Sequence, residues 1–183
     1  MKPLISAWID AVFVSILSMP EDENRRVWAF IDELASLEKL ASLEAALTKG
    51  RKHGLRVVAG LQSTAQLDDI YGRDSAQTLR SCFRSLAVLG GSKTDPRTCE
   101  DMSKALGQHE VERDRYSKNM GEKTSRTKAE DVKMESVVTP SEIASLPELT
   151  GFLALAGDFP VARFKLEPLN FKKINEPFME RVA

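Results

Sequence analysis

Cysteine and histidine are scarce in this chain of 183 residues, which contains two of each. Two cysteines in a chain of this length form no disulfide framework, and the four side chains have no zinc-ligand spacing, so a reducing compartment is expected. Charge of one sign is also lacking, because 26 Lys and Arg face 27 Asp and Glu. This balance excludes a domain that holds nucleic acid by bulk positive charge alone, although a local basic strip is not excluded.

Several catalytic motifs are missing as well. The chain has no G-x-x-x-x-G-K-[ST] phosphate-binding loop, no G-x-S-x-G nucleophile elbow and no H-E-x-x-H zinc motif. A long membrane span is also missing, since the apolar run at 4–19 is short and contains Asp10. We expect a buried amphipathic helix there, with its start or its packing partner outside this chain. The composition, 42% hydrophobic and 29% charged, is typical of one globular domain.

Apolar runs alternate with helical patterns along the first part of the chain. The expected elements are a strand buried on both faces at 27–31, a helix at 34–54 with Leu37, Leu40, Leu43 and Leu47 on one side, a buried strand at 55–61, a helix from Ser63 to Tyr71, a helix at 74–83, a strand at 85–90 and a helix from Asp95 to Leu106. This alternation predicts an α/β fold with a mostly parallel sheet flanked by helices.

Residues 108–135 predict an exposed, charged excursion, a long hairpin with seven charges of each sign. Its part at 115–128 carries five cations and one acid, so it faces DNA, a neighbouring subunit, or only solvent. A capping box from Thr139 begins a short helix. A C-terminal β-hairpin follows, and the tail at 168–183 is expected to be peripheral.

Two acids end the first expected strand. Asp32 and Glu33 directly follow VWAFI, which is the form of a Walker B element. A buried parallel strand delivers such a pair to the sheet edge where α/β folds bind ligands. The first carboxylate can hold Mg²⁺, and the second can orient and polarise an attacking water. The same pair also suits the acidic beginning of a helix.

Two more polar residues have a possible role at a phosphate. Gln62 ends the second expected strand, where an NTPase places a group that senses the γ-phosphate or positions water. Alternatively, Gln62 is an ordinary polar residue that precedes a helix. Arg51 lies between the two strands near a helix end. There it either reaches a phosphate across a subunit boundary or serves as a helix C-terminal cation.

Two long strings of the sequence resemble the TraD/TrwB-type coupling proteins of type IV conjugative systems, FIDELASLEKLASLEAALTKGRKHGLRVVAGLQSTAQLDDIYG and LRSCFRSLAVLGGSKTDPRTCEDMSKALGQHEVERDRYSKN. The resemblance runs from about Pro3 to Leu166 and implies a partial RecA-like P-loop NTPase fold. It also implies a motor that assembles as a hexameric ring at the cytoplasmic face of the bacterial inner membrane. Using ATP and Mg²⁺, such motors take the DNA of the relaxosome proteins to the type IV secretion channel.

The resemblance also assigns roles to residues. Asp32 and Glu33 correspond to the Walker B pair, with Asp32 as the Mg²⁺ ligand. Asp32, Glu33 and Gln62 contact the nucleotide, and Glu33, Gln62 and Arg51 are catalytic, with Arg51 acting on the neighbouring subunit's nucleotide. The family's transmembrane helices, Walker A loop and all-helical insertion would precede Met1.

We therefore expect residues 1–167 to be the C-terminal part of the motor domain. By itself this chain would be soluble and cytoplasmic, and inactive as an ATPase because it has no Walker A loop. The alternative is a non-catalytic truncated remnant that acts, if at all, as an interaction module with coupling-protein subunits.

Overall fold

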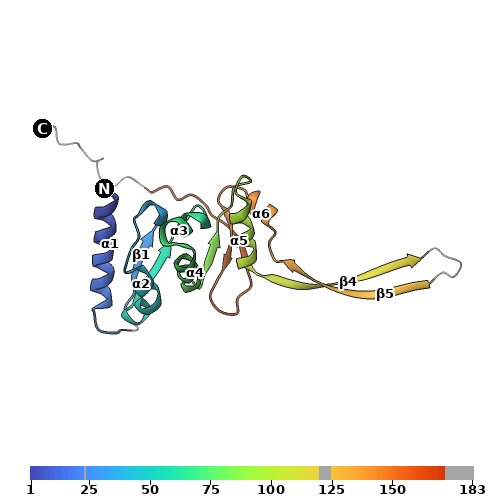
Figure 1. The fold of residues 1–183 in the computed structure, drawn as a ribbon, viewed down its shortest axis with the longest axis horizontal. Coiled ribbons are helices and arrows are strands. Elements are labelled where there is room, and N and C mark those ends of the chain that lie inside the picture. Colours follow the sequence, from blue (N-terminus) through green and yellow to red (C-terminus); the bar gives the residue numbers. More distant parts are fainter. Residues whose placement is uncertain (23, 120–124, 172–183) are drawn as a thin grey trace.

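The computed structural model describes residues 1–22, 24–119 and 125–171, and at 111–119 and 125–132 it describes the backbone alone. Helices and small sheets form a body from which one long hairpin projects (Figure 1). Among the described residues, no helix has the length and hydropathy that crossing a bilayer requires.

The order of elements follows the predicted alternation. The elements are α1 (Lys2–Leu17), β1 (Val27–Ile31), η1 (Leu34–Ser36), α2 (Leu43–Lys49), η2 (Gly50–His53), β2 (Leu55–Ala59), α3 (Thr64–Tyr71), α4 (Arg73–Cys82), β3 (Leu86–Val88), α5 (Pro96–Leu106), β4 (Gln108–Asn119), β5 (Ser125–Ser136), α6 (Pro140–Ala144), β6 (Thr150–Ala154) and β7 (Ala162–Lys165). The expected caps are present, since the side chains of Ser63, Asp95 and Thr139 each accept a backbone N–H at the start of a helix. The predicted α/β fold class is confirmed.

Among the residues that the structure describes, parallel pairing is limited to two strands. β1 and β2 pair in parallel with Val27 opposite Leu55 and Ile31 opposite Ala59. The described strand β3, which we expected in the same parallel sheet, instead pairs antiparallel with β6, and β6 pairs antiparallel with β7. The predicted C-terminal hairpin is therefore confirmed, and it provides the neighbour that β3 uses.

Two hydrophobic clusters of described residues hold the body together. The first lies beneath β1 and β2 and joins them to the helices α1–α4 through buried side chains such as Phe13, Leu43, Leu67 and Leu79. The second joins α5 and α6 to the antiparallel sheet through Val88, Cys99 and Ile143. Cys99 is a free cysteine of this core, and its burial raises the pKa of its thiol.

The helix predicted over 34–54 was wrong in extent. The structure has the short η1 turn, an irregular segment, and then α2 and η2. Side chains distant in the sequence accept the backbone N–H groups of this segment. Tyr71 Oη accepts from Leu40 N–H at 3.2 Å, and the Asp10 carboxylate accepts from the N–H groups of Ala41 and Ser42 at 3.2 and 2.9 Å. These bonds replace the ones that a continuous helix would form.

One face of the parallel sheet is open, contrary to the prediction that β1 is buried on both faces. Val27, Ala29 and Ile31 pack against the first cluster, whereas Trp28 and Phe30 are 56% and 73% exposed and stack on each other at 5.9 Å. Val58 on the predicted buried strand β2 is 43% exposed.

The expected buried helix at the N-terminus is also only half covered. Phe13 and Ile16 are buried, while Leu4 and Trp8 on α1 are exposed. The helices α1–α4 thus lie on one side of β1 and β2, and the opposite side carries uncovered aromatic rings.

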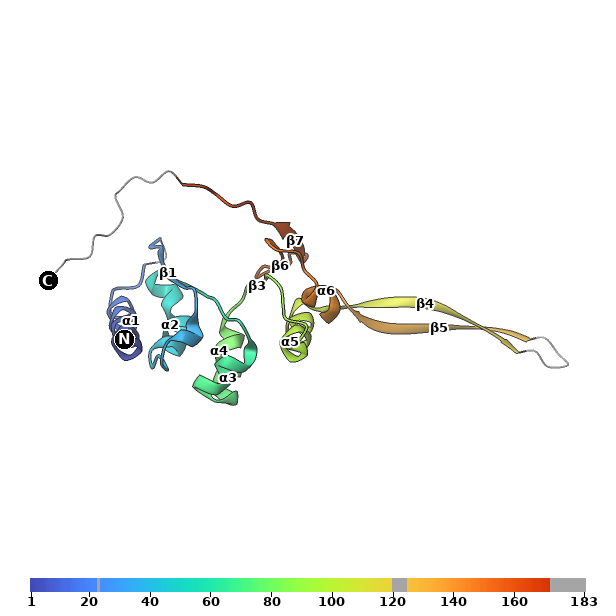
Figure 2. The same cartoon turned by 90° about the horizontal axis from the view of Figure 1, so that it is seen from above.

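The predicted long hairpin is confirmed as β4 and β5, which pair antiparallel from Gln108 opposite Ser136 to Asn119 opposite Ser125. It leaves the body next to α5 and α6, and both views show it extending away from them (Figures 1 and 2). The base is fixed by a 2.6 Å hydrogen bond from Ser103 Oγ to the carbonyl of Val138. Lys123 of the basic stretch and most of the predicted tail, 172–183, lie outside the described residues.

Candidate functional site

The predicted acids and glutamine meet at one edge of the parallel sheet. Asp32 and Glu33 follow β1, and Gln62 follows β2, so the parallel register brings them to the same carboxyl edge. The two chain segments are also bonded beyond the strands. Gly60 N–H donates to the carbonyl of Ile31 at 2.8 Å, and Leu34 N–H donates to the carbonyl of Gly60 at 3.0 Å. These bonds hold the segments after the two strands side by side.

Glu33 and Gln62 are in direct contact. Gln62 Nε2 donates a hydrogen bond to Glu33 Oε2 at 2.6 Å. The second carboxylate oxygen, Glu33 Oε1, is buried and has no hydrogen-bond partner among the described residues. An unpaired buried carboxylate oxygen is costly, so a hydrogen bond from a bound molecule would stabilise it. A water held there would face a carboxylate that can take its proton.

Asp32 has a different environment. Its side chain is exposed, next to the half-buried Glu33. No group of three or more His, Cys, Asp and Glu side chains suited to a metal occurs in the described part of the chain. Mg²⁺ commonly uses one or two protein carboxylates together with phosphate oxygens and water. An accessible Asp32, next in the sequence to Glu33, therefore fits a Mg²⁺–nucleotide complex better than an all-protein metal site.

Gly60 is a functional position that the sequence reasoning missed. A Cβ atom at this residue would lie 2.0 Å from the carbonyl oxygen of Asp32 and 3.0 Å from its carbonyl carbon. Only glycine permits this approach of two backbones. Its signal in the sequence was a single glycine that follows the apolar run VVA, two positions before Gln62.

Gln62 is itself positioned by the helix that follows it. The Gln66 side-chain oxygen accepts from the N–H groups of Gln62 and Ser63 at 3.2 and 3.3 Å. The capping box of Ser63 and Gln66 was predicted, but its reach to Gln62 was not. The first residue of α3 is tied to α5, because Thr64 Oγ1 donates to Asp101 Oδ2 at 3.0 Å.

An ion-pair network around Asp68, a residue of α3, connects this helix to its neighbours. Arg80 on α4 and Arg97 on α5 donate to the two oxygens of this carboxylate at 2.8 and 2.9 Å. The hydrogen bond from Arg80, more than any other contact, holds the pKa of Asp68 below its ordinary value. The network therefore joins three helices around the segment that presents Gln62.

Arg51 is not brought to this group. It lies exposed in η2, before β2 begins, and hence at the amino edge of the sheet. A strand of five residues separates the two edges by about 17 Å. A role of Arg51 at a phosphate bound near Glu33 would thus require the Arg51 of another subunit.

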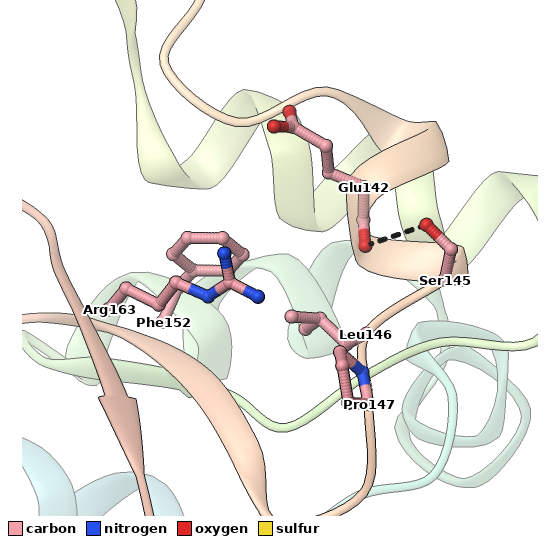
Figure 3. A pocket seen from close by; sticks show the side chains of 6 residues that line it. All are labelled: Glu142, Ser145, Leu146, Pro147, Phe152 and Arg163. Atoms are coloured by element: carbon pink, nitrogen blue, oxygen red, sulfur yellow. Dashed lines mark hydrogen bonds between the residues drawn. The ribbon is translucent and has the colours of Figure 1, made fainter.

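A hollow elsewhere in the molecule is too small to compete as the nucleotide site. It has a volume of about 110 Å³ and is lined by Glu142, Ser145, Leu146, Pro147, Phe152 and Arg163 (Figure 3). Ligand pockets are usually about 300–1,000 Å³. The Arg163 guanidinium lies 5.9 Å from the centre of the Phe152 ring. None of the predicted site residues lines this hollow.

Comparison with known proteins gives a family match over most of the chain. The family model for the type IV secretion-system coupling protein DNA-binding domain matches residues 1–167. Coupling protein TraD of Escherichia coli (strain K12) is 33% identical over 184 residues, covering 99% of this chain and 25% of TraD. A probable conjugal transfer protein TraG of Sinorhizobium fredii is 27% identical over 163 residues, covering 87% of this chain and 24% of TraG. The chain thus spans about a quarter of the length of these relatives.

Solved structures agree with the sequence matches. The unbound coupling protein TrwBdeltaN70 is 64% identical with a TM-score of 0.83, covering 93% of this chain and 38% of that chain. TrwB in complex with ADP and Mg²⁺ is 60% identical with a TM-score of 0.82, covering 95% of this chain and 38% of that chain. The α/β architecture described above is therefore shared with TrwB.

Proposed function

This chain belongs to the type IV secretion-system coupling proteins, and on that premise we propose that it is part of a DNA-translocating ATPase. The complete protein couples the DNA relaxosome to a type IV secretion channel in conjugation, and this chain carries the Walker B half of the nucleotide site. The observation that carries the proposal is the hydrogen bond between Gln62 and Glu33 at the carboxyl edge of the sheet.

Each residue at this edge has a chemical role in the proposal. Asp32 is the carboxylate that holds Mg²⁺, and Mg²⁺ supplies neutralisation of phosphate charge. Glu33 accepts the proton of the attacking water through its unpaired oxygen. Gln62 holds Glu33 by its amide and senses the γ-phosphate from the neighbouring strand end. The complex of the related TrwB with ADP and Mg²⁺ supports these assignments.

We assign Arg51 a role between subunits of a ring-shaped assembly. Its position at the opposite edge of the sheet supports a finger that acts on the nucleotide of the next subunit in a ring, where its planar fork suits developing phosphate charge. We propose a homohexamer at the cytoplasmic face of the inner membrane. Its partners are DNA, the relaxosome proteins and the type IV secretion channel.

A second function is favoured by a different observation. The sequence contains no phosphate-binding loop, and one side of α1 and one face of β1 are uncovered. A non-catalytic remnant that binds coupling-protein subunits through these surfaces would have the same features.

The native size of the product, combined with its ATPase activity, separates the two functions. We expect an antibody against residues 168–183 to detect a band far above 20.3 kDa in cells. The purified native species should hydrolyse Mg-ATP, and Asp32→Ala should abolish the hydrolysis. The exposed Asp69 provides a control, since Asp69→Ala should leave hydrolysis intact. A band at 20.3 kDa without specific turnover would establish the remnant instead.

A further inference from the structure

The charges of the β4–β5 hairpin are divided along its length. In the outer half, residues 115–119 pair with residues 125–129, and these ten residues include four cations and no acid. In the inner half, residues 110–114 pair with residues 130–134, and these ten include five acids and two cations. The projecting hairpin is thus acidic near the body and basic further out.

Like charges stand opposite each other on one face of this hairpin. Asp114 pairs with Glu130, and four residues further along the strand Lys118 pairs with Arg126. Alternate residues of a strand share a face, so both rungs belong to the same face, which we term the charged face. The rung between them on that face pairs Tyr116 with Lys128. The opposite face instead pairs opposite charges, Arg113 with Asp131.

These rungs destabilise the hairpin as an isolated unit. Like charges directly opposite each other on a sheet repel, and a two-stranded ribbon that projects into water is marginally stable by itself. At the base of the charged face, Glu110 and Met134 are both exposed. A partner that offers cations to Asp114 and Glu130 and anions to Lys118 and Arg126 would remove both repulsions.

We propose that the charged face binds the charged face of a second copy of this chain, with the two hairpins antiparallel. The rung of Tyr116 and Lys128 lies midway between the two like-charged rungs. A two-fold axis through that rung places the basic rung of each copy against the acidic rung of the other. Each rung lies about 7 Å from the axis along the strand, so both contacts form at once.

A nucleic acid is a poorer occupant of this face. Phosphates would match the basic outer half but would be repelled by the acidic inner half. A second copy matches both like-charged rungs. A two-fold contact does not close a ring of six, so this pairing is additional to the proposed ring. Its test measures self-association and needs no nucleotide turnover.

Charge exchange in the full chain tests the pairing. We expect K118D/R126D and D114K/E130K each to weaken self-association by about tenfold or more, measured by sedimentation velocity at low salt. A mixture of these two variants should associate again, because one carries acids in both rungs and the other carries cations in both. The fourfold exchange K118D/R126D/D114K/E130K should associate with itself and not with the original chain. The control S117D/T127D places acids on the opposite face, in the rung next to Lys118, and should associate as the original chain does.

Three outcomes would overturn the proposal. A chain that sediments as a monomer has no such pairing. Association that is equal in all variants belongs to another surface, such as the exposed rings of Trp28 and Phe30. Loss of binding to duplex or single-stranded DNA in K118D/R126D, together with unchanged self-association, would assign the outer half to DNA.

Discussion

Gln62 Nε2 donates a 2.6 Å hydrogen bond to Glu33 Oε2, although 29 residues separate the two in the sequence. Three features of the fold produce this contact. The strands β1 and β2 are parallel and in register, Gly60 lets the two backbones meet beyond the strands, and Gln66 holds the backbone of Gln62. In this arrangement the other carboxylate oxygen, Glu33 Oε1, has no hydrogen-bond partner among the described residues.

Replacement of Gly60 by alanine should disturb the site through the backbone. The new methyl group would overlap the Asp32 carbonyl, so one segment must move. We expect a loss of about 1–3 kcal/mol in the free energy of unfolding, measured by urea titration, and reduced ATP turnover in the complete protein. Gly50→Ala is the milder comparison, because its Cβ would lie 3.1 Å from side-chain atoms of the buried Leu55 and would meet no backbone atom among its three nearest neighbours, so turnover should persist. Equal effects of the two substitutions would show that the approach of Gly60 to Asp32 is unimportant.

Removal of the Gln62 amide should affect catalysis more than binding. In the complete protein, we expect Gln62→Ala to lower kcat for ATP by about ten- to a hundredfold with a small change in KM, since Glu33 loses the group that orients it. Gln77→Ala, at an exposed position on α4, is the matched control and should retain the original kcat. An unchanged kcat in Gln62→Ala would remove Gln62 from the catalytic site.

The parts of the fold that depend on neighbouring residues were predictable. The apolar run VWAFI gave the bounds of β1 correctly, and the capping residues Ser63, Asp95 and Thr139 marked the starts of three helices. The parallel pairing of β1 and β2 also follows from the alternation of strands and helices, and it was enough to expect Glu33 and Gln62 at one edge.

The remaining features depend on residues far apart in the sequence. The segment 37–42 is not helical because Asp10 and Tyr71 accept its N–H groups, and a local pattern of leucines carries no record of those partners. Similarly, the apolar composition of β1 did not reveal that the face with Trp28 and Phe30 is uncovered. Glycine at position 60 was visible in the sequence, but its 2.0 Å approach to Asp32 was not.

Tyr71→Phe tests the long-range bond that interrupts the predicted helix. The substitution leaves the buried Leu40 N–H without the hydroxyl that accepts it, so we expect a loss of about 1–2 kcal/mol in the free energy of unfolding. Amide hydrogen exchange at Leu40 should become faster, while exchange in α5 should change little. Unchanged stability and unchanged exchange at Leu40 would contradict this explanation of the irregular segment.

Acid should weaken the network around Asp68. Its folded pKa is lowered by Arg80 and Arg97, so its contribution is present above the unfolded pKa of about 3.9 and is lost as the pH falls through the folded value. We expect Asp68→Asn to cost about 1–2 kcal/mol at pH 7 and progressively less below pH about 4. The control Asp69→Asn changes the exposed neighbour and should leave the pH profile of unfolding unchanged. A cost of Asp68→Asn that is the same at all pH values would exclude this linkage.

Mixing of variants tests the assignment of Arg51 to a neighbouring subunit. In the complete protein, Arg51→Ala and Glu33→Gln should each lose ATP turnover. A mixed assembly of the two should recover part of it, because some interfaces then combine an intact Arg51 from one subunit with an intact Glu33 from the next. Lys52→Ala, at an exposed neighbouring position, is the control and should stay active by itself. No recovery on mixing would contradict action across the subunit boundary.

The most direct test of the account is ATP binding and phosphate release by the complete protein with Glu33→Gln, measured side by side. We predict that the variant binds Mg-ATP with nearly unchanged affinity, because Asp32 remains, and that phosphate release falls by at least about a hundredfold, because no carboxylate takes the proton of the water. Phosphate release at the original rate would contradict the account, since Glu33 would then have no part in the hydrolysis.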